Sequence, residues 1–278
     1  MAGRLIICAT PIGNLEDVSP RLRSAIEESE FVYAEDTRRS RVLLEALGVN
    51  RPLRSYFTGN EAARSKELAT RLAAGAVIAL VTDAGTPAIA DPGYSAVRAA
   101  IEAGAEVTVV PGPSAVTAAL AVSGLPTDRF VFEGFLPRKK GLRAALFEDL
   151  AVEPRTIVLF ASPGRVAADL SDLAEHLGPE RPVTVARELT KAFEEVWRGT
   201  LDGAVARWTS TSPRGEFTLV VAGAPADTVD LGAALDRVEA LQEEGTSLSE
   251  AVRSVAAESG MRRRTLYEAA LRRNSTHT

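Results

Sequence analysis

Short apolar runs alternate with amphipathic stretches along the first part of the chain. Four apolar runs have the length of a strand, and they cover 4–10, 31–36, 77–83 and 106–112. Helical patterns of one to three turns follow them, over 19–30, 64–76, 93–105 and 113–124. Strands that alternate with helices predict a parallel α/β sheet. The runs are continuous rather than strictly alternating, which predicts strands that are buried on both faces.

A stretch rich in Gly, Pro and charge, 124–141, breaks this rhythm and predicts a domain boundary. Strand and helix patterns then resume, over 155–162, 165–178, 182–189, 191–208 and 215–223. They predict a second α/β unit with more hairpin character. After a linker, 233–273 is expected to be wholly helical. The predicted fold class is therefore α/β, with an N-terminal α/β domain, a second α/β domain and a helical tail, bounded at 1–124, 125–226 and 227–278.

The helical tail has the layout of two short helices joined at a glycine. Ser247 and Glu250 form a capping box, and small apolar residues follow on one helical face. Gly260 is expected to end this helix. Three arginines open the next one: Arg262, Arg263 and Arg264. This is the layout of a helix-turn-helix, and the basic start favours RNA as a partner. A plain helical hairpin that covers a dimer surface is the alternative.

The net charge of −5 gives no general sign of a nucleic-acid partner, although three local basic patches exist, at 36–41, 137–143 and 260–273. No apolar run approaches the length of a membrane span, and the N-terminus lacks the features of a signal peptide. We therefore expect a cytoplasmic protein without a membrane partner. The single cysteine, Cys8, excludes an internal disulfide and a cysteine-built metal site, and we expect it to be a buried strand residue.

The motifs of several common enzyme classes are missing. The sequence contains no Gly-x-Gly-x-x-Gly, no P-loop, no Gly-x-Ser-x-Gly and no His-Glu-x-x-His. The two histidines, His176 and His277, fall on a predicted surface helix and at the end of the tail. Nucleophilic and metal-hydrolytic chemistry therefore lack support, and we expect no metal.

Four predicted strands of the first unit end in loops of unusual chemistry, at 10–14, 34–38, 83–87 and 111–115. Ligands bind at the carboxyl ends of strands in open parallel sheets. Small residues allow a ligand to approach the backbone, and prolines hold a loop in shape. Any one such loop is also explained by ordinary turn chemistry. Four of them at one sheet edge favour a binding site.

Six motifs occur in order in this chain: "TPIGNL", "AEDTR", "TDAGTPAIADPG", "PGPSA", "EGFLP" and "ARELTK". In these motifs the sequence resembles the bacterial 16S rRNA cytidine 2′-O-ribose methyltransferases, which are tetrapyrrole-methylase-like enzymes that use S-adenosyl-L-methionine (SAM). The resemblance runs from Leu5 to about Gly223, and the tail also fits. It implies two α/β domains with SAM in the cleft between them. It also implies 16S rRNA in the small ribosomal subunit as substrate, and a homodimer.

The resemblance further implies which residues hold SAM: Pro11, Asp83, Gly85, Thr86, Pro87, Ser114, Ala115, Ala161, Ala186 and Thr218. Thr86 stands where related porphyrin enzymes have an aspartate. An ammonium contact would therefore fall to Asp83 or Asp91. At 56–61 and 161–165 the histidines of the family pattern are absent, so their roles do not carry over to this chain.

A sulfonium methyl group is already activated, so the enzyme mainly positions and desolvates the reactants. A ribose 2′-hydroxyl still needs a base or a nearby cation. Without a useful histidine, the candidates are Asp36, Glu61, Asp83, Glu133, Glu188 and Lys191, of which we expect Lys191, Glu188 and Asp36 to be catalytic. Lys191 would take the proton or stabilise the alkoxide, and a plain ion pair between Glu188 and Lys191 is the alternative.

Arginines supply the expected RNA contacts. Arg38 and Arg39 are expected to bind phosphates together with the three tail arginines, and a solvated helix start is the competing interpretation. Two other functions are alternatives. One is methylation of a tetrapyrrole, which the "AGTP" loop and the basic tail count against. The other is a non-enzymatic RNA-binding module, which the intact small-walled loops count against.

Overall fold

The computed structural model describes residues 3–210, 213–225, 231–259 and 263–276. It contains two compact units, Met1–Ala222 and Gly223–Thr278, and the first unit carries two β-sheets. Arg262, named above as an RNA contact, and Gly260, named as a helix end, lie outside the described residues. None of the described helices combines the length and the apolar character that a membrane span requires.

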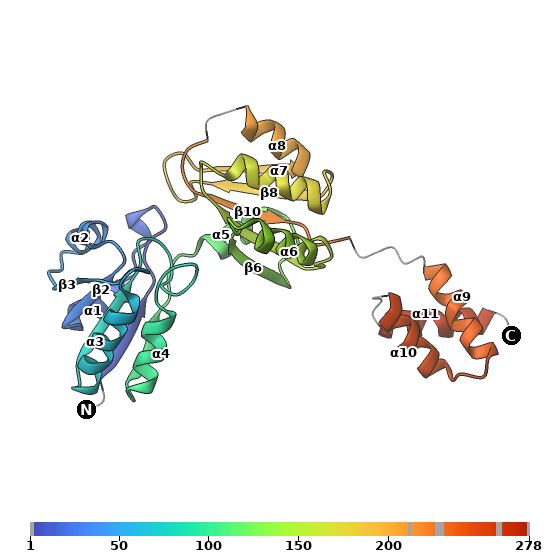
Figure 1. Ribbon diagram of the computed structural model, residues 1–278, viewed down its shortest axis with the longest axis horizontal. Helices are drawn as coiled ribbons and strands as arrows, with labels where there is room; N and C mark the ends of the chain where they lie inside the picture. Colours follow the sequence, from blue (N-terminus) through green and yellow to red (C-terminus); the bar gives the residue numbers. More distant parts are fainter. Residues whose placement is uncertain (1–2, 211–212, 226–230, 260–262, 277–278) are drawn as a thin grey trace. The chain divides into compact units, whose positions relative to one another are not determined.

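Five parallel strands form the first sheet in the order β3-β2-β4-β1-β5 (Figure 1). The strands are β1 (Arg4–Cys8), β2 (Phe31–Ala34), β3 (Leu53–Ser55), β4 (Val77–Val81) and β5 (Glu106–Val110). Two separate apolar clusters cover the two faces of this sheet. The helices α1 (Pro20–Glu28) and α2 (Thr37–Ala46) pack on one face, and α3 (Glu61–Ala73) and α4 (Tyr94–Glu102) pack on the other. The predicted burial on both faces is confirmed for β1, β2 and β4, whereas β5 lies at the edge of the sheet and its Val109 is 53% exposed.

Two details of the first sheet were also predicted correctly. Ser19 caps α1, because its hydroxyl accepts a hydrogen bond from the backbone N–H of Leu22 at 3.1 Å, and Pro20 opens the helix. Cys8 is fully buried in β1, and burial raises the pKa of its thiol to about 12. The thiol therefore stays protonated and packs as a small apolar group.

Helix α2 and strand β3 lie where no element was predicted. The first turn of α2 is dominated by arginines, so the sequence does not show a clear apolar stripe there. Its helical start is fixed instead by Asp36, whose carboxylate accepts the N–H of Arg38 at 2.8 Å. Strand β3 is three residues long and lies at the edge of the sheet. A run of that length carries too little periodicity to be recognised.

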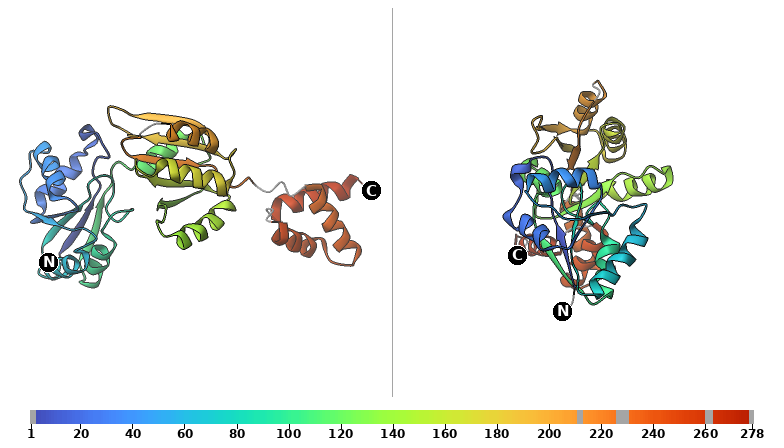
Figure 2. Two further views of the ribbon diagram at one scale, coloured as in Figure 1. Left: turned by 45° about the horizontal axis from the view of Figure 1, so that its top comes forward. Right: turned by 90° about the vertical axis from the view of Figure 1, so that its left-hand side faces the viewer.

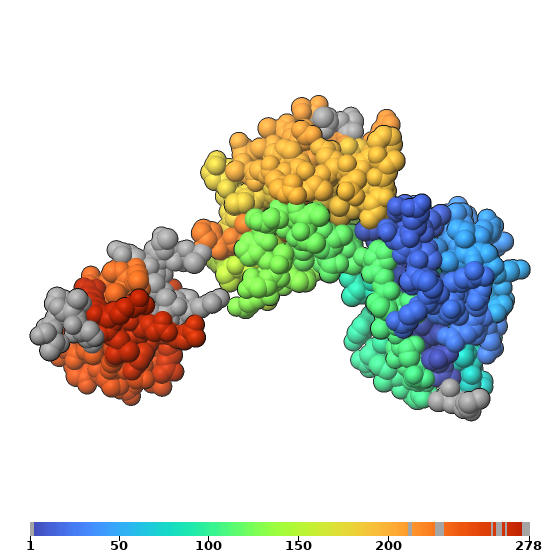
Figure 3. Space-filling view, turned by 180° about the vertical axis from the view of Figure 1, so that it is seen from behind, coloured from blue at the N-terminus to red at the C-terminus, as the bar shows by residue number. Residues whose placement is uncertain are grey.

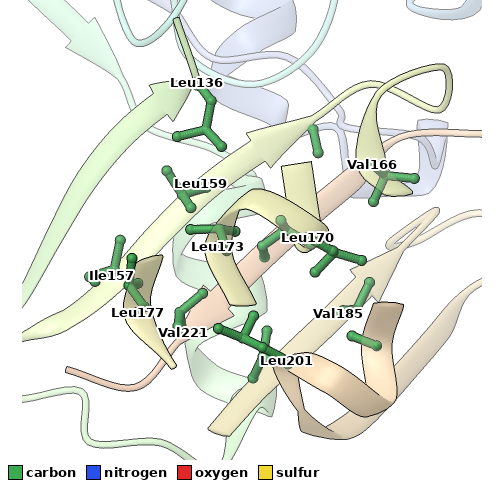
Figure 4. Close-up of a cluster of buried hydrophobic side chains, with 14 of the residues drawn as sticks. Leu136, Ile157, Leu159, Val166, Leu170, Leu173, Leu177, Val185, Leu201 and Val221 are labelled. Atoms are coloured by element: carbon green, nitrogen blue, oxygen red, sulfur yellow. The ribbon is translucent and has the colours of Figure 1, made fainter. Parts of the chain in front are cut away.

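The second sheet has the order β6-β7-β10-β8-β9, and only the β6–β7 pair is parallel. Its strands are β6 (Phe130–Phe135), β7 (Thr156–Ala161), β8 (Pro182–Arg187), β9 (Glu195–Thr200) and β10 (Phe217–Val221). One face is covered by α6 (Lys140–Ala151), α7 (Val166–Leu177) and α8 (Leu201–Thr209). Leucines of α7, among them Leu170 and Leu173, point toward the sheet in Figure 4. The antiparallel pairing of the consecutive strands β8 and β9 shows the expected hairpin character.

Helix α5 (Ala115–Ser123) follows β5 directly and packs on the other face of the second sheet. Val116 and Leu120 contact Val158 and Val220 of that sheet. The boundary predicted after residue 124 assigns α5 to the N-terminal domain, and the domain boundaries stay a prediction. What matters for the site is that α5 leaves the carboxyl edge of the first sheet and lies on the second. Its first turn therefore lies between the two sheets.

The described residues of the second unit form three helices: α9 (Leu231–Glu243), α10 (Leu248–Ser259) and α11 (Arg263–Thr276) (Figure 2). The hydroxyl of Ser247 accepts the backbone N–H of Glu250 at 3.4 Å, which is the first half of the predicted capping box, and donates to the Glu250 carboxylate at 2.8 Å. Val252, Val255 and Leu266 belong to the core of this unit. In the space-filling view of Figure 3 the three helices form one compact mass. The predicted helical tail thus has a hydrophobic core of its own.

Candidate functional site

The loops after β1, β2 and β4 meet at the carboxyl edge of the first sheet and are joined by hydrogen bonds. The backbone of Thr10 exchanges two hydrogen bonds with the backbone of Gly85, at 2.8 and 3.2 Å. The backbone N–H of Asp36 donates to the carboxylate of Asp83 at 3.0 Å. Gly85 has a φ of +85°, a conformation that favours glycine. The loops therefore form one fixed wall, and the glycine is needed for its shape.

This wall borders a cavity of about 290 Å³ whose lining comes from both sheets and from the first turn of α5. The lining residues are Ile12, Ala84, Gly85, Thr86, Ile89, Ala90, Asp91, Ser114, Ala115, Val116, Phe135, Phe160, Ala161, Ser162, Pro163, Ala186, Leu189, Glu216, Phe217 and Thr218. We call it the main cavity. Most of the residues predicted to hold SAM line it. Pro87 is buried in the same loop as Thr86.

The main cavity has an aromatic wall and an acidic character. The rings of Phe135 and Phe160 lie on it with their centroids 5.6 Å apart. The charged residues in its lining are Asp91 and Glu216, both of them acidic. An aromatic wall can hold a flat ring, and carboxylates attract a cation. The cavity therefore suits a ligand that combines a flat ring with positive charge.

Asp91 shares a hydroxyl group with a second acid. The Oγ1 atom of Thr82 lies 2.7 Å from Oδ2 of Asp91 and 2.8 Å from Oε2 of Glu35. A hydroxyl carries one hydrogen, so both hydrogen bonds form only when one of the two carboxyl groups is protonated. Burial raises the pKa of Asp91 to about 6, although the Thr82 hydroxyl opposes this shift. Asp91 therefore binds a proton more readily than an exposed aspartate does.

Backbone strain is found in two loops that each contribute a residue to the lining of the main cavity, Ala90 and Leu189. Among the described residues, the non-glycine residues with positive φ are Ala88 (71°), Ala90 (60°), Glu188 (51°) and Thr190 (68°). The first two belong to the loop after β4, and the other two to the loop after β8. Such conformations cost on the order of 1–3 kcal/mol each and cluster at functional sites. Their positions therefore support the same site as the cavity does.

Glu61, a candidate base in the sequence, has a supporting role in the structure. Its carboxylate accepts the N–H of Gly93 at 3.2 Å, the Tyr56 hydroxyl at 3.3 Å and the Ser95 hydroxyl. The hydrogen bond from Ser95 is the main reason that the pKa of Glu61 is lowered. These contacts fix the start of α4, and with it the end of the loop that borders the main cavity.

A second pocket, of about 230 Å³, adjoins the main cavity, because Ile12, Ala84 and Glu216 line both. Its other lining residues are Thr10, Pro11, Gly13, Leu15, Arg39, Val42, Leu43, Asp83 and Lys191. We call it the polar pocket. It contains two residues predicted to hold SAM, Pro11 and Asp83, and the predicted catalytic residue Lys191. These residues come from both α/β halves of the first unit.

Lys191 lies between two carboxylates. Its Nζ is 2.8 Å from Oε1 of Glu188 and 2.9 Å from Oε2 of Glu216. Burial alone lowers the pKa of Lys191, but the two hydrogen bonds outweigh it and the net pKa is raised. The alternative expectation, an ion pair between Glu188 and Lys191, is thus met, and Glu216 is a third partner. Lys191 is a cation at neutral pH rather than a base.

The remaining predicted residues lie in different surroundings. Asp36 is bound by the side chain and the N–H of Arg38, and these hydrogen bonds lower its pKa to about 2. Arg39 is 3.3 Å from the carboxylate of Asp83. In the helical unit, Arg263 and Arg264 are exposed at the start of α11. Because its pKa is about 2, Asp36 is a weak proton acceptor.

Several residues of the main cavity were not predicted, among them Phe135, Phe160 and Glu216. Phe135 belongs to the "EGFLP" motif, which was a usable signal. Phe160 and Glu216 lie in or beside ordinary apolar strands of the second sheet. Their part in the site depends on how the two sheets meet, which no local pattern encodes.

Comparisons with known proteins agree with this architecture. The family model described as Tetrapyrrole (Corrin/Porphyrin) Methylases matches residues 4–205. Proteins called "Ribosomal RNA small subunit methyltransferase I" are similar over nearly the whole chain. The one from Synechocystis sp. is 47% identical over 272 residues, which cover 97% of this chain and 98% of that protein. The one from Mycobacterium tuberculosis (strain CDC 1551 / Oshkosh) is 48% identical, with 97% and 95% covered.

Solved structures are similar to most of the chain. Uroporphyrin-III-C-methyltransferase from Thermus thermophilus has a TM-score of 0.54 and 21% identity, over 79% of this chain and 94% of that one. Diphthine synthase has a TM-score of 0.59 and 16% identity, and the match covers 79% of this chain and 89% of that one. At these identities the likeness establishes a common fold.

Proposed function

The chain belongs to the tetrapyrrole methylase family, and we propose that it transfers a methyl group from SAM to the 2′-hydroxyl of a cytidine in 16S rRNA of the small ribosomal subunit. The relatives that match almost the whole chain are called ribosomal RNA small subunit methyltransferases. The observation that carries the proposal is the main cavity with the polar pocket beside it. One holds the donor, and the other presents Lys191 to the acceptor.

The main cavity fits SAM. Ala161 and Ala186 leave room for a flat ring, and Phe160 offers an aromatic surface. Gly85 permits close approach to the backbone. At a pH above its pKa of about 6, Asp91 is ionised and supplies negative charge toward the cationic half of SAM, in place of the aspartate that Thr86 replaces. When bound, SAM supplies an activated methyl group.

The chain itself supplies charge and a proton acceptor. Lys191 is charged, so it stabilises negative charge that develops on the attacking oxygen. Glu188 positions Lys191 through their ion pair. Asp83 lines the same pocket, and its pKa is raised, chiefly by burial. We therefore propose Asp83 as the acceptor of the hydroxyl proton. Asp36, with a pKa of about 2, is less suited to that role.

The proposed RNA contacts lie on both units. Arg38 and Arg39 are exposed on α2 beside the polar pocket. Arg263 and Arg264 are exposed on α11 and would bind phosphates of the same RNA. We also propose that the protein acts as a homodimer in the cytoplasm. Exposed apolar side chains such as Tyr94, Ile101 and Val109 offer a surface for a second copy.

The test uses purified protein and methyl-labelled SAM. Small ribosomal subunits from a strain that lacks the modification are offered beside naked 16S RNA and uroporphyrinogen. We expect label in the RNA, and we expect it to protect one phosphodiester bond from alkaline cleavage, because that bond needs a free 2′-hydroxyl. The position of the protected bond identifies the nucleotide. Label in uroporphyrinogen and none in RNA would overturn the proposal in favour of a small-molecule methyltransferase.

A further inference from the structure

The polar pocket opens beside the main cavity and has two unlike sides. Leu15 and Val42 form an apolar side, and these residues are 49% and 57% exposed. Arg39 and Lys191 bring positive charge to the other side. Exposed aliphatic groups next to cations suit a ligand with a flat apolar face and an anionic group. A nucleotide has both of these features.

The two arginines at the start of α2 differ in availability. The guanidinium of Arg38 binds both carboxylate oxygens of Asp36, at 3.1 and 2.7 Å. Arg39 makes a longer ion pair with Asp83, at 3.3 Å, and its side chain is 68% exposed. A phosphate can therefore compete for Arg39 more easily than for Arg38.

The position of Lys191 fixes where the reacting oxygen lies. Its ammonium group is bound to Glu216, which lines both the main cavity and the polar pocket. A hydroxyl at Lys191 is therefore at the junction of the two. The volume of about 230 Å³ also limits the ligand, because it suits a single nucleotide better than a macrocycle of four rings.

Resting on the function proposed above, we propose that the polar pocket binds one pyrimidine nucleotide that has left its base stack. Its base lies against Leu15 and Val42, a phosphate beside it binds Arg39, and its 2′-hydroxyl lies at Lys191. Bases are commonly unstacked for recognition in single-stranded RNA and for enzymatic modification. The occupant is thus the acceptor nucleotide, held next to the methyl donor.

Steady-state kinetics with small ribosomal subunits test this assignment. Arg39→Ala and Val42→Glu are each expected to raise the KM for subunits about tenfold, while the dissociation constant for SAM stays within about twofold of wild type. Arg23→Ala, which removes an exposed arginine of α1, is the matched control and should change neither constant. An unchanged KM in both pocket variants would overturn the proposal.

A second measurement does not depend on activity. Subunits that carry 4-thiouridine at the nucleotide located by alkaline cleavage are irradiated in complex with the protein. We expect crosslinks to peptides that contain Leu15 or Val42, and crosslinks confined to other peptides would overturn the proposal. A failure of the function proposed above is recognised in a different experiment, because wild-type protein would then transfer no label from SAM to the RNA.

Discussion

A methyl group on Gly13 would lie 2.4 Å from Cγ of Lys191. Gly13 follows the first strand of the first sheet, whereas Lys191 belongs to the loop after β8 of the second sheet. The backbone of Gly13 is not in the left-handed region, so a glycine is required there by close approach rather than by φ. The two halves of the first unit therefore meet at this contact, and the lysine lies across the loop of the other half.

Gly13→Ala is expected to displace Lys191 and to lower kcat by about tenfold to a hundredfold, because small misplacements of catalytic groups have effects of this size. The affinity for SAM should remain, since Gly13 lines the polar pocket and not the main cavity. Gly141→Ala is the matched control, because a methyl group there meets no atom within 4 Å. Full kcat in Gly13→Ala would contradict the role given to this contact.

Lys191 is predicted to act by its charge. Lys191→Met should lower kcat by roughly a hundredfold to a thousandfold, the range seen when one group that stabilises an oxyanion is removed. Lys191→Arg keeps the charge but is a far weaker base, and it should retain much more activity than Lys191→Met. Equal loss of kcat in both variants would instead identify Lys191 as the base. Calorimetry with SAM checks that both variants still bind the donor.

The pH dependence of stability should reveal Asp91. Its pKa is about 6 in the folded protein and 3.8 ordinarily, so the folded state binds the proton more tightly than the unfolded state. The contribution of Asp91 to stability is therefore fully present below about pH 4 and is lost as the pH rises through about 6. Asp91→Asn cannot ionise and escapes this loss. Urea unfolding from pH 4.5 to 7.5 should show the variant gaining stability relative to wild type, and a constant difference would contradict the assignment.

Replacing an alanine of positive φ with glycine is expected to affect the free energy of unfolding differently from the same replacement in a helix. Ala→Gly inside a helix costs about 1 kcal/mol, and Ala145→Gly, at an exposed position in the interior of α6, should follow that rule. At Ala90, where φ is 60°, glycine relieves the left-handed conformation at the expense of backbone entropy. Ala90→Gly is therefore expected to leave the free energy of unfolding unchanged or to raise it by up to about 1 kcal/mol. Urea unfolding of both variants measures the contrast, and equal losses would exclude strain at Ala90.

Much of this architecture was predictable because its signals are local. Continuous apolar strands fixed the parallel sheet, and small residues such as Gly85 and Ala115 marked the wall of the main cavity. Helix α2 was missed because its start depends on a cap by Asp36 rather than on an apolar stripe. Glu216 was missed because it joins Lys191 only after the antiparallel strands of the second sheet pair. Contacts of this kind depend on topology, which the sequence pattern encodes only indirectly.

The arginines at the start of α11 should contribute to RNA affinity through phosphates. Arg264 has a side chain that is 92% exposed, and its ion pair with Glu268 is long, at 3.7 Å. Replacing both Arg263 and Arg264 with glutamate should weaken RNA binding and make the slope of log K against log salt less steep by one to two, since each phosphate contact contributes about 0.7–0.9.

A double variant of equal net charge separates local contacts from general repulsion. Arg237→Glu combined with Arg253→Glu alters two exposed arginines of α9 and α10 and reverses the same amount of charge. If Arg263 and Arg264 touch RNA, this control pair should keep the wild-type salt slope and lose less affinity than the α11 pair. Equal losses in the two double variants, measured by filter binding over a range of salt concentrations, would mean that the helical unit acts only through its net charge. The affinity for SAM should be the same in all three proteins, because the main cavity is lined by residues of the first unit.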